Sequence, residues 1–148
     1  MSHPTVPQLL WNESLMTGVP EIDEQHMILV HTLNQAAEKL SRDAGLEVLE
    51  PITRDLLSYA LYHFDTEEDL MQHYGYDAAV HEDAKLHLEQ HRSFSAKVVT
   101  VRENLKLGIL IPPTDLIEFL NGWLVNHILN TDKRLASFII AKRAAKGS

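Results

Sequence analysis

Cysteine is absent from the 148-residue sequence. Its absence excludes disulfide bonds, zinc–thiolate sites and iron–sulfur clusters ligated by this chain. Long apolar runs are missing as well, because no stretch approaches the roughly 18 apolar residues of a membrane-spanning helix. The first ten residues include two prolines but no lysine or arginine. We therefore expect neither a membrane span nor a signal peptide, and we predict a cytoplasmic protein.

Positive charge is also scarce. The chain has 13 Lys and Arg residues against 21 Asp and Glu residues, a formal net charge of -8, and the basic residues do not cluster. Binding to nucleic acid or to an anionic membrane surface is therefore not expected. Because 45% of the residues are hydrophobic, the chain can form a substantial core, and we predict a single domain over residues 1–148.

Proline and glycine separate four apolar stretches that have the period of an α-helix. We predict helices from about residue 21 to 41, from 51 (or already 46) to 74, from a start between 76 and 80 to 107, and from about 113 to 143. The predicted fold is all-α, an up-down-up-down antiparallel four-helix bundle over residues 21–143. Thr114 is the expected N-cap of the fourth helix.

Residues 1–20 lack a sustained period and contain Pro4, Pro7, Gly18 and Pro20. We therefore expect them to form an irregular N-terminal arm. The apolar side chains that we expect to pack this arm against the bundle are Leu9, Leu10, Trp11, Leu15 and Met16.

Histidine is what the chain has in excess, with nine residues. Five of them fall on the apolar lines of the predicted helices: His26, His63, His87, His91 and His127. A lone buried histidine is more often a hydrogen-bonded core residue than a ligand. Five on the inner lines of four helices favour a metal site, since metal can satisfy that many imidazoles in one core. The four-residue step from His87 to His91 lets both rings reach one ion.

Two carboxylates are candidates to complete the site. Glu67 follows His63 by one helical turn and shares its face, although a solvated residue in an acidic run is the plain alternative. Asp132 follows His127 by five residues, about 140° around an ideal α-helix, so periodicity indicates a surface residue or the partner of a lysine. Imidazole and carboxylate ligands suit a pair of iron ions, while zinc and manganese stay open.

These motifs resemble those of the bacterial hemerythrins, in the same order and over nearly the whole chain. The matching segments are Trp11-Asn12, residues 18–26, His63-Phe64-x-x-Glu67-Glu68-x-Leu70-Met71-x-x-Tyr74-Gly75-Tyr76, His87-x-x-x-His91-x-x-Phe94 and Trp123-Leu124-x-Asn126-His127-Ile128-x-x-Thr131-Asp132. The resemblance implies two iron ions joined by an oxo or hydroxo group, with dioxygen as the ligand.

The resemblance also implies a division of the ligands. One iron would take His87, His91 and His127, and the other would take His26 and His63 and keep a position open for dioxygen. Glu67 and Asp132 would bridge the two ions, which overrides the periodic interpretation of Asp132. The residues that flank His127 and would exclude water from the oxygen pocket are Trp123, Leu124 and Ile128; plain core packing is their alternative role.

One segment departs from the family pattern. The spacer from Tyr76 to His87 is longer than expected and contains a further histidine, His81. If His81 were the first ligand of its helix, its partner one turn later would be Lys85, which is not a neutral donor at ordinary pH. We therefore keep His87 and His91. The histidines that match no motif position are His3, His31 and His73, which we expect at the surface or beside the site.

The sequence favours a reversible dioxygen-binding protein for oxygen storage, delivery or sensing over an enzyme. The alternative is a di-iron enzyme acting on peroxide, nitric oxide or ferrous iron, which a polar acid or base in the open pocket would favour. A histidine-phosphotransfer bundle would need an exposed histidine in a His-x-x-Lys-Gly setting, and none of the nine has it. Delivery or sensing would require a separate protein partner, such as one that consumes oxygen.

Overall fold

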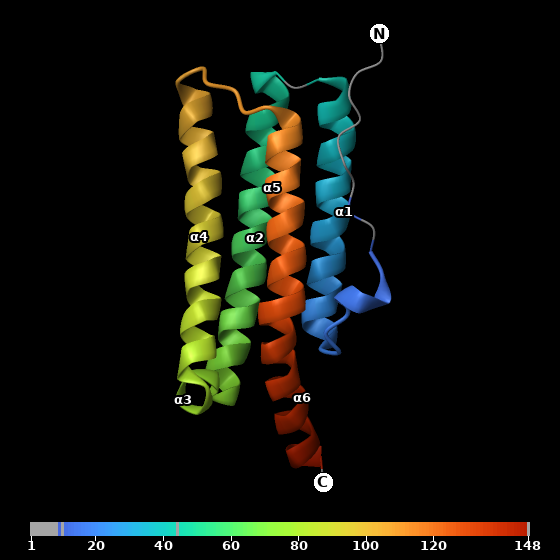
Figure 1. The fold of residues 1–148 in the computed structure, drawn as a ribbon, viewed down its shortest axis with the longest axis vertical. Coiled ribbons are helices and arrows are strands. Elements are labelled where there is room, and N and C mark those ends of the chain that lie inside the picture. Colours follow the sequence, from blue (N-terminus) through green and yellow to red (C-terminus); the bar gives the residue numbers. More distant parts are fainter. Residues whose placement is uncertain (1–8, 10, 44, 148) are drawn as a thin grey trace.

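The computed structural model describes residues 9, 11–43 and 45–147 and contains helices but no strand in these ranges. The short elements are the 3-10 helix η1 (Glu13–Leu15) and α3 (Tyr76–Ala79). The long ones are α1 (Pro20–Arg42), α2 (Leu46–Tyr74), α4 (His81–Lys106) and α5 (Pro113–Asn126), which continues through the π-helix η2 (His127–Asp132) into α6 (Lys133–Gly147). Figure 1 shows α1, α2, α4 and the α5–α6 column side by side, alternating in direction. The predicted up-down-up-down bundle is confirmed.

Local chemistry explains where most of the long helices begin and end. Pro20 opens α1 with acidic residues in the first turn, and Lys39 and Arg42 lie in its last turn, as the helix dipole favours. The second helix starts at Leu46, the earlier of the two predicted positions, so Pro51 lies inside it. This helix stops at Gly75, whose backbone has the left-handed φ of 70° that glycine adopts without strain.

Two details at helix starts differ from the expectation. Thr114 is not an N-cap, because α5 already begins at Pro113 and the capping position falls on Pro112, without a side-chain cap. The open boundary after Gly75 becomes a single turn of helix, α3, followed by a bend at Val80 (φ -139°, ψ 64°) from which α4 begins. The bend allows the chain to turn from α2 into α4 without a loop.

The described part of the N-terminal arm, residues 9 and 11–19, contacts the bundle through three of the predicted side chains. Leu15 is buried, and Leu9 and Trp11 pack on the core as half-buried side chains. Met16 does not pack, since 44% of its surface is exposed. Leu10 lies outside the described residues. The Asp23 carboxylate ties the arm to α1 by accepting hydrogen bonds from the backbone and hydroxyl of Thr17 and from the backbone of Gly18.

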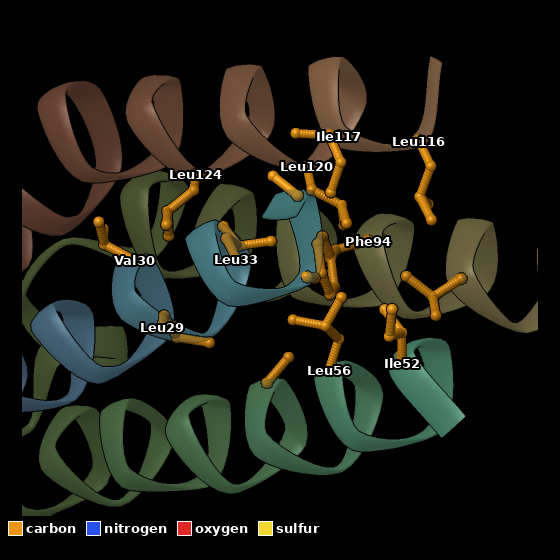
Figure 2. Close-up of a cluster of buried hydrophobic side chains, with 14 of the residues drawn as sticks. Leu29, Val30, Leu33, Ile52, Leu56, Phe94, Leu116, Ile117, Leu120 and Leu124 are labelled. Carbon is orange, nitrogen blue, oxygen red and sulfur yellow. The ribbon is translucent and has the colours of Figure 1, made fainter. Parts of the chain in front are cut away.

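The apolar core is divided along the bundle axis. The larger cluster fills the half of the bundle around Leu33, Leu56, Phe94 and Leu120 (Figure 2). A smaller cluster, which includes Ile22, Tyr76 and Leu135, fills the end where α6 packs. Between the two clusters each long column contributes buried polar side chains. The residues that form this polar layer are His26, His63, Glu67, His87, His91, His127 and Asp132.

Within the part of the chain that the structure describes, no helix combines the length and the apolar character that crossing a bilayer requires.

Candidate metal centre

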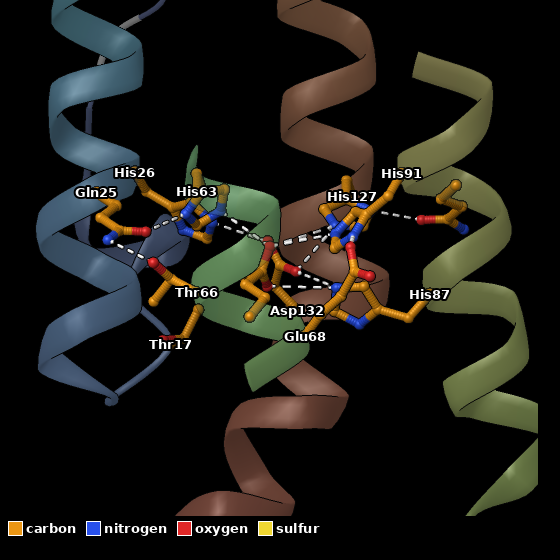
Figure 3. Close-up of polar contacts among 12 residues, drawn as sticks. Thr17, Gln25, His26, His63, Thr66, Glu68, His87, His91, His127 and Asp132 are labelled. Atoms are coloured by element: carbon orange, nitrogen blue, oxygen red, sulfur yellow. Dashed lines mark hydrogen bonds and ion pairs between the residues drawn. The ribbon is translucent and has the colours of Figure 1, made fainter. Parts of the chain in front are cut away.

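All seven predicted ligand residues converge in the polar layer. His26 comes from α1, and His63 and Glu67 come from α2. His87 and His91 come from α4, and His127 and Asp132 come from η2. No more than 3% of any of these residues is exposed. Figure 3 shows His26 and His63 on one side of Asp132 and the other three histidines on its opposite side. The inner histidine lines read from the sequence therefore do meet at one level of the bundle.

The π-helix explains why Asp132 contradicts its α-helical periodicity. In a π-helix the hydrogen bonds join residues five apart, so residues with that spacing lie nearly above one another on one face. His127 and Asp132 are the first and last residues of η2, and Asp132 is completely buried. The α-helical periodicity, which by itself indicated a surface residue, was therefore wrong for Asp132, while its burial is consistent with the ligand position implied by the family resemblance. Single π-turns inside α-helices frequently mark functional sites.

The candidate ligand atoms form two groups that share a carboxylate. Glu67 belongs to both groups, one with His87, His91 and His127 and the other with His26, His63 and Asp132, and the atoms within each group lie within 4.8 Å of one another. The Glu67 Oε1 atom is 2.9 Å from His63 Nε2, while its Oε2 atom is 3.3 Å from His87 Nε2. The Oε1 atom also lies 3.4 Å from His91 Nε2, so the Glu67 carboxylate reaches both groups.

Asp132 also spans the two groups. Its Oδ2 atom lies 2.8 Å from His26 Nε2, and its Oδ1 atom lies 3.2 Å from His87 Nε2 and 3.0 Å from His127 Nε2. Both carboxylates are therefore placed between a group with two histidines and a group with three. This arrangement can hold two cations joined by two carboxylates.

The hydrogen-bond inventory supports a cation at this place. The Nε2 atoms of all five histidines and all four carboxylate oxygens of Glu67 and Asp132 are buried without a hydrogen-bond partner among the described residues. Burying polar atoms without partners costs several kcal/mol, on the order of 1–3 kcal/mol for each group. Nitrogen and oxygen donors that all point to one volume are the ligands that borderline divalent metals prefer. The donor set therefore fits a pair of metal ions.

Three of the rings are oriented by side chains on a neighbouring helix. The Nδ1 atom of His63 lies 2.7 Å from the Gln25 carbonyl oxygen, and that of His127 lies 2.6 Å from the Gln90 carbonyl oxygen. The Nδ1 atom of His91 lies 3.1 Å from the Glu68 carboxylate. Because these partners only accept hydrogen bonds at the oxygen, each Nδ1 carries the proton, which leaves the Nε2 lone pair free to bind metal.

These orienting residues were missed by the sequence reasoning, although a signal existed. Gln25, Glu68 and Gln90 are each the chain neighbour of a predicted ligand, but each contacts a histidine on a different helix. Gln25 and Gln90 are themselves held, because Gln25 donates to the Thr66 hydroxyl at 3.0 Å and Gln90 accepts from the Thr131 hydroxyl at 2.7 Å. Pairings across helices are not readable from periodicity.

The buried charges of the layer are mutually compensating. Burial by itself would raise the pKa of Glu67, but the neighbouring histidines, His63 first, hold that pKa well below its ordinary value. Burial by itself would lower the pKa of His87 and His127, yet the carboxylates override it and raise the pKa of His87 to about 10 and that of His127 to about 9. Burial dominates at His91, whose pKa is lowered. Metal ions would replace the protons held by the histidines.

The remaining described histidines take no part in the layer. His31, His73 and His81 are exposed. His81 lies 2.8 Å from the Asp77 carboxylate one turn earlier, on the outer surface. The long spacer is taken up by α3 and by the first turns of α4, so His87 and His91 reach the polar layer. His3 lies outside the described residues.

The three predicted pocket residues have different surroundings. The Trp123 ring stacks on His127, with ring centroids 4.5 Å apart and an angle of 14° between the planes. Trp123 and Leu124 line a small apolar cavity of about 20 Å³ that also touches Leu29 and Phe64. Ile128 is completely buried in the larger core cluster and is not part of this lining. The cavity lies about one helical turn from the histidines, because Leu29 and Leu124 are three residues from His26 and His127.

Comparisons with known proteins agree with this arrangement. Residues 17–139 match the family described as Hemerythrin HHE cation binding domain. The chain is 33% identical over 127 residues to a bacteriohemerythrin of Pseudomonas paraeruginosa, an alignment that covers 84% of this chain and 76% of the relative. It is 30% identical to a bacteriohemerythrin of Stenotrophomonas maltophilia, with coverage of 90% and 82%. Myohemerythrin-1 of Phascolopsis gouldii is 28% identical, with coverage of 83% and 87%. The matched residues span all four columns of the bundle, and the chain belongs to the hemerythrin family.

Proposed function

We propose that this protein binds dioxygen reversibly at a non-haem di-iron centre and serves oxygen storage, delivery or sensing. The observation that carries the proposal is the convergence, in two groups, of five buried Nε2 atoms and four buried carboxylate oxygens that have no hydrogen-bond partner among the described residues. The proposed ligands of the two iron ions are His26, His63, Glu67, His87, His91, His127 and Asp132. Because all four columns supply ligands, we also propose that the chain works as one domain.

The unequal histidine counts suggest where dioxygen binds. Glu67 and Asp132 would join both ions, His87, His91 and His127 would complete one of them, and the ion held by His26 and His63 would keep a free position. Iron held by these residues would supply the reversible redox chemistry that dioxygen binding requires. The protein's own residues fix the rings through their Nδ1 partners and provide only two carboxylates, less negative charge than an all-carboxylate site.

The cavity beside the centre favours binding over catalysis. Its nine lining residues are all hydrophobic, so they exclude water and offer no acid or base to a bound molecule. A di-iron enzyme acting on peroxide, nitric oxide or ferrous iron would be expected to place such a group there. A cytoplasmic location and an oxygen-consuming partner stay predictions.

Anaerobic reconstitution tests the proposal. Protein loaded with ferrous iron should contain about two ions per chain, as the two groups of donors require. On admission of oxygen it should develop a visible absorption band that disappears when oxygen is removed, over repeated cycles. A band that forms once and does not reverse would refute the binding function and favour the enzyme.

A ligand variant tests the assignment itself. His63→Ala should reduce the iron content, because it removes one of the two histidines of the proposed oxygen-binding ion. His73→Ala is the matched control, since His73 lies exposed on the same helix. Unchanged iron content in His63→Ala, or an equal loss in the control, would contradict the assignment.

A further inference from the structure

Two hollows meet at a single aromatic side chain. The apolar cavity beside the metal centre is lined mainly by buried side chains, and an outer hollow of about 290 Å³ lies against Gln90, Asn126, His127 and Asn130. Trp123 lines both of them. Its indole therefore forms part of the wall between the surface and the cavity.

The other walls of the cavity are sealed more tightly. Eight of the nine lining residues are buried, and Trp123 is the one whose surface is partly exposed. The buried residues come from all four columns of the bundle, as Leu29, Leu56, Phe94 and Leu120 illustrate in Figure 2. Passage at the other walls would displace side chains that are buried and closely packed, whereas passage at Trp123 displaces a side chain that is already partly exposed.

The indole of Trp123 is packed against other rings but is not locked in place. The indole lies against His127 on one face and is 4.6 Å from the Phe94 ring and 5.7 Å from the Phe64 ring, measured between centroids. The outer hollow on its solvent side leaves room for the ring to swing outward. Rotations of partly exposed side chains are fast compared with the unfolding of a helix.

We propose that Trp123 is the gate through which dioxygen passes between the outer hollow and the apolar cavity beside the metal centre. The inference rests on the proposed oxygen-binding function for its physiological meaning, but the passage itself depends only on the arrangement of the two hollows. A small uncharged diatomic molecule can slip past a briefly displaced indole, while larger or charged molecules are held outside. The gate thus selects by size and polarity what reaches the centre.

A gate changes rates without changing the equilibrium. In Trp123→Ala loaded with iron, association and dissociation of dioxygen should both accelerate, each roughly tenfold, which corresponds to about 1.4 kcal/mol of barrier. Because Trp123 also stacks on His127, the faster association is the result that identifies a gate. Trp123→Phe, which keeps an aromatic ring of smaller size, should fall between the wild type and Trp123→Ala and covers the case in which the alanine variant folds poorly.

Phe119 supplies the matched control. It lies one turn before Trp123 on α5, is half-buried, stacks on Phe94 with ring centroids 6.2 Å apart, and lines neither hollow. Phe119→Ala should leave both rates unchanged. Equal acceleration in Phe119→Ala would show that dioxygen enters through general loosening of the helices and would overturn the gate. An unchanged association rate in Trp123→Ala would overturn it as well, since any effect on dissociation would then act through the His127 contact.

A second measurement separates the gate from the oxygen-binding function. Zinc accepts the same nitrogen and oxygen ligands but has no redox chemistry, so zinc-loaded protein can be exposed to dissolved dioxygen without reaction. The exchange of dioxygen with the cavity is then followed by its paramagnetic effect on the methyl groups of Leu29 and Leu124 in NMR relaxation. Faster exchange in Trp123→Ala but not in Phe119→Ala supports the gate even if the iron protein fails to bind oxygen reversibly. Exchange within about twofold of the wild type, less than 0.5 kcal/mol of barrier, refutes it.

Discussion

Replacement of Gln90 by leucine tests how far the metal centre depends on the residues that orient its ligands. The Gln90 carbonyl oxygen accepts from His127 Nδ1 at 2.6 Å and from the Thr131 hydroxyl at 2.7 Å. Leucine has a similar size but cannot accept either bond. His127 then loses its fixed tautomer and ring orientation, and loss of such a partner typically lowers metal affinity about 10- to 100-fold. That loss corresponds to roughly 1.4–2.7 kcal/mol of binding free energy.

The same substitution should destabilise the metal-free protein. A buried donor without a partner costs about 1–3 kcal/mol, and Gln90→Leu leaves two. Gln90 is half-buried and borders the outer hollow, so water can reach part of this volume. We therefore expect a total near the lower end, about 1–2 kcal/mol, in the free energy of unfolding. Thr131→Val removes only the second bond and should leave metal affinity nearly unchanged.

The assays are anaerobic titration of ferrous iron against a competing chelator and denaturant unfolding of the metal-free protein. Gln72→Leu is the control, because Gln72 is exposed on α2. Metal affinity within about threefold of the wild type, or less than 0.7 kcal/mol, would refute the role given to Gln90. An equal loss in Gln72→Leu would show that the effect is not specific to the site.

Three further results are expected. Glu67→Gln should lower the occupancy of both metal positions together, because Glu67 belongs to both ligand groups, and metal analysis that finds one position still filled would contradict its shared role. Leu56→Ala should reduce the free energy of unfolding by about 2–5 kcal/mol in denaturant titrations, since Leu56 is 3% exposed within the larger core cluster. The hydrogen bond from Arg143 lowers the pKa of Glu21 below its ordinary 4.5, so its stabilisation is present above that pH and is lost as the pH falls through the folded value. Arg143→Ala should therefore cost less than about 1 kcal/mol at pH 7 for this exposed pair, and a cost that persists at low pH would argue against the linkage.

Residues at the chain's turns and arm show where local rules fail. Threonine is a residue type that favours the N-cap, but at Thr114 the helix has already begun. Pro113 occupies the first helical position, where proline is tolerated because its missing N–H would have no helical partner. Met16 directly follows the buried Leu15 and is still 44% exposed. Local propensity describes which backbone conformations have a low free energy, while tertiary packing selects among them.

The sequence by itself determined which faces of the helices are buried, and hence that five histidines and Glu67 point inward. Burial repeats with the helical period, and the period is a local property of the chain. Tertiary structure decided the rest: that the inward side chains meet at one level between two apolar clusters, and that Gln25, Glu68 and Gln90 each orient a histidine on another helix. The assignment of Asp132 as a candidate ligand required both sources. Its family motif indicated a ligand, but only the wider turn of the π-helix places Asp132 on the same face as His127. Those relations join residues far apart in the chain or depend on backbone geometry that composition does not encode.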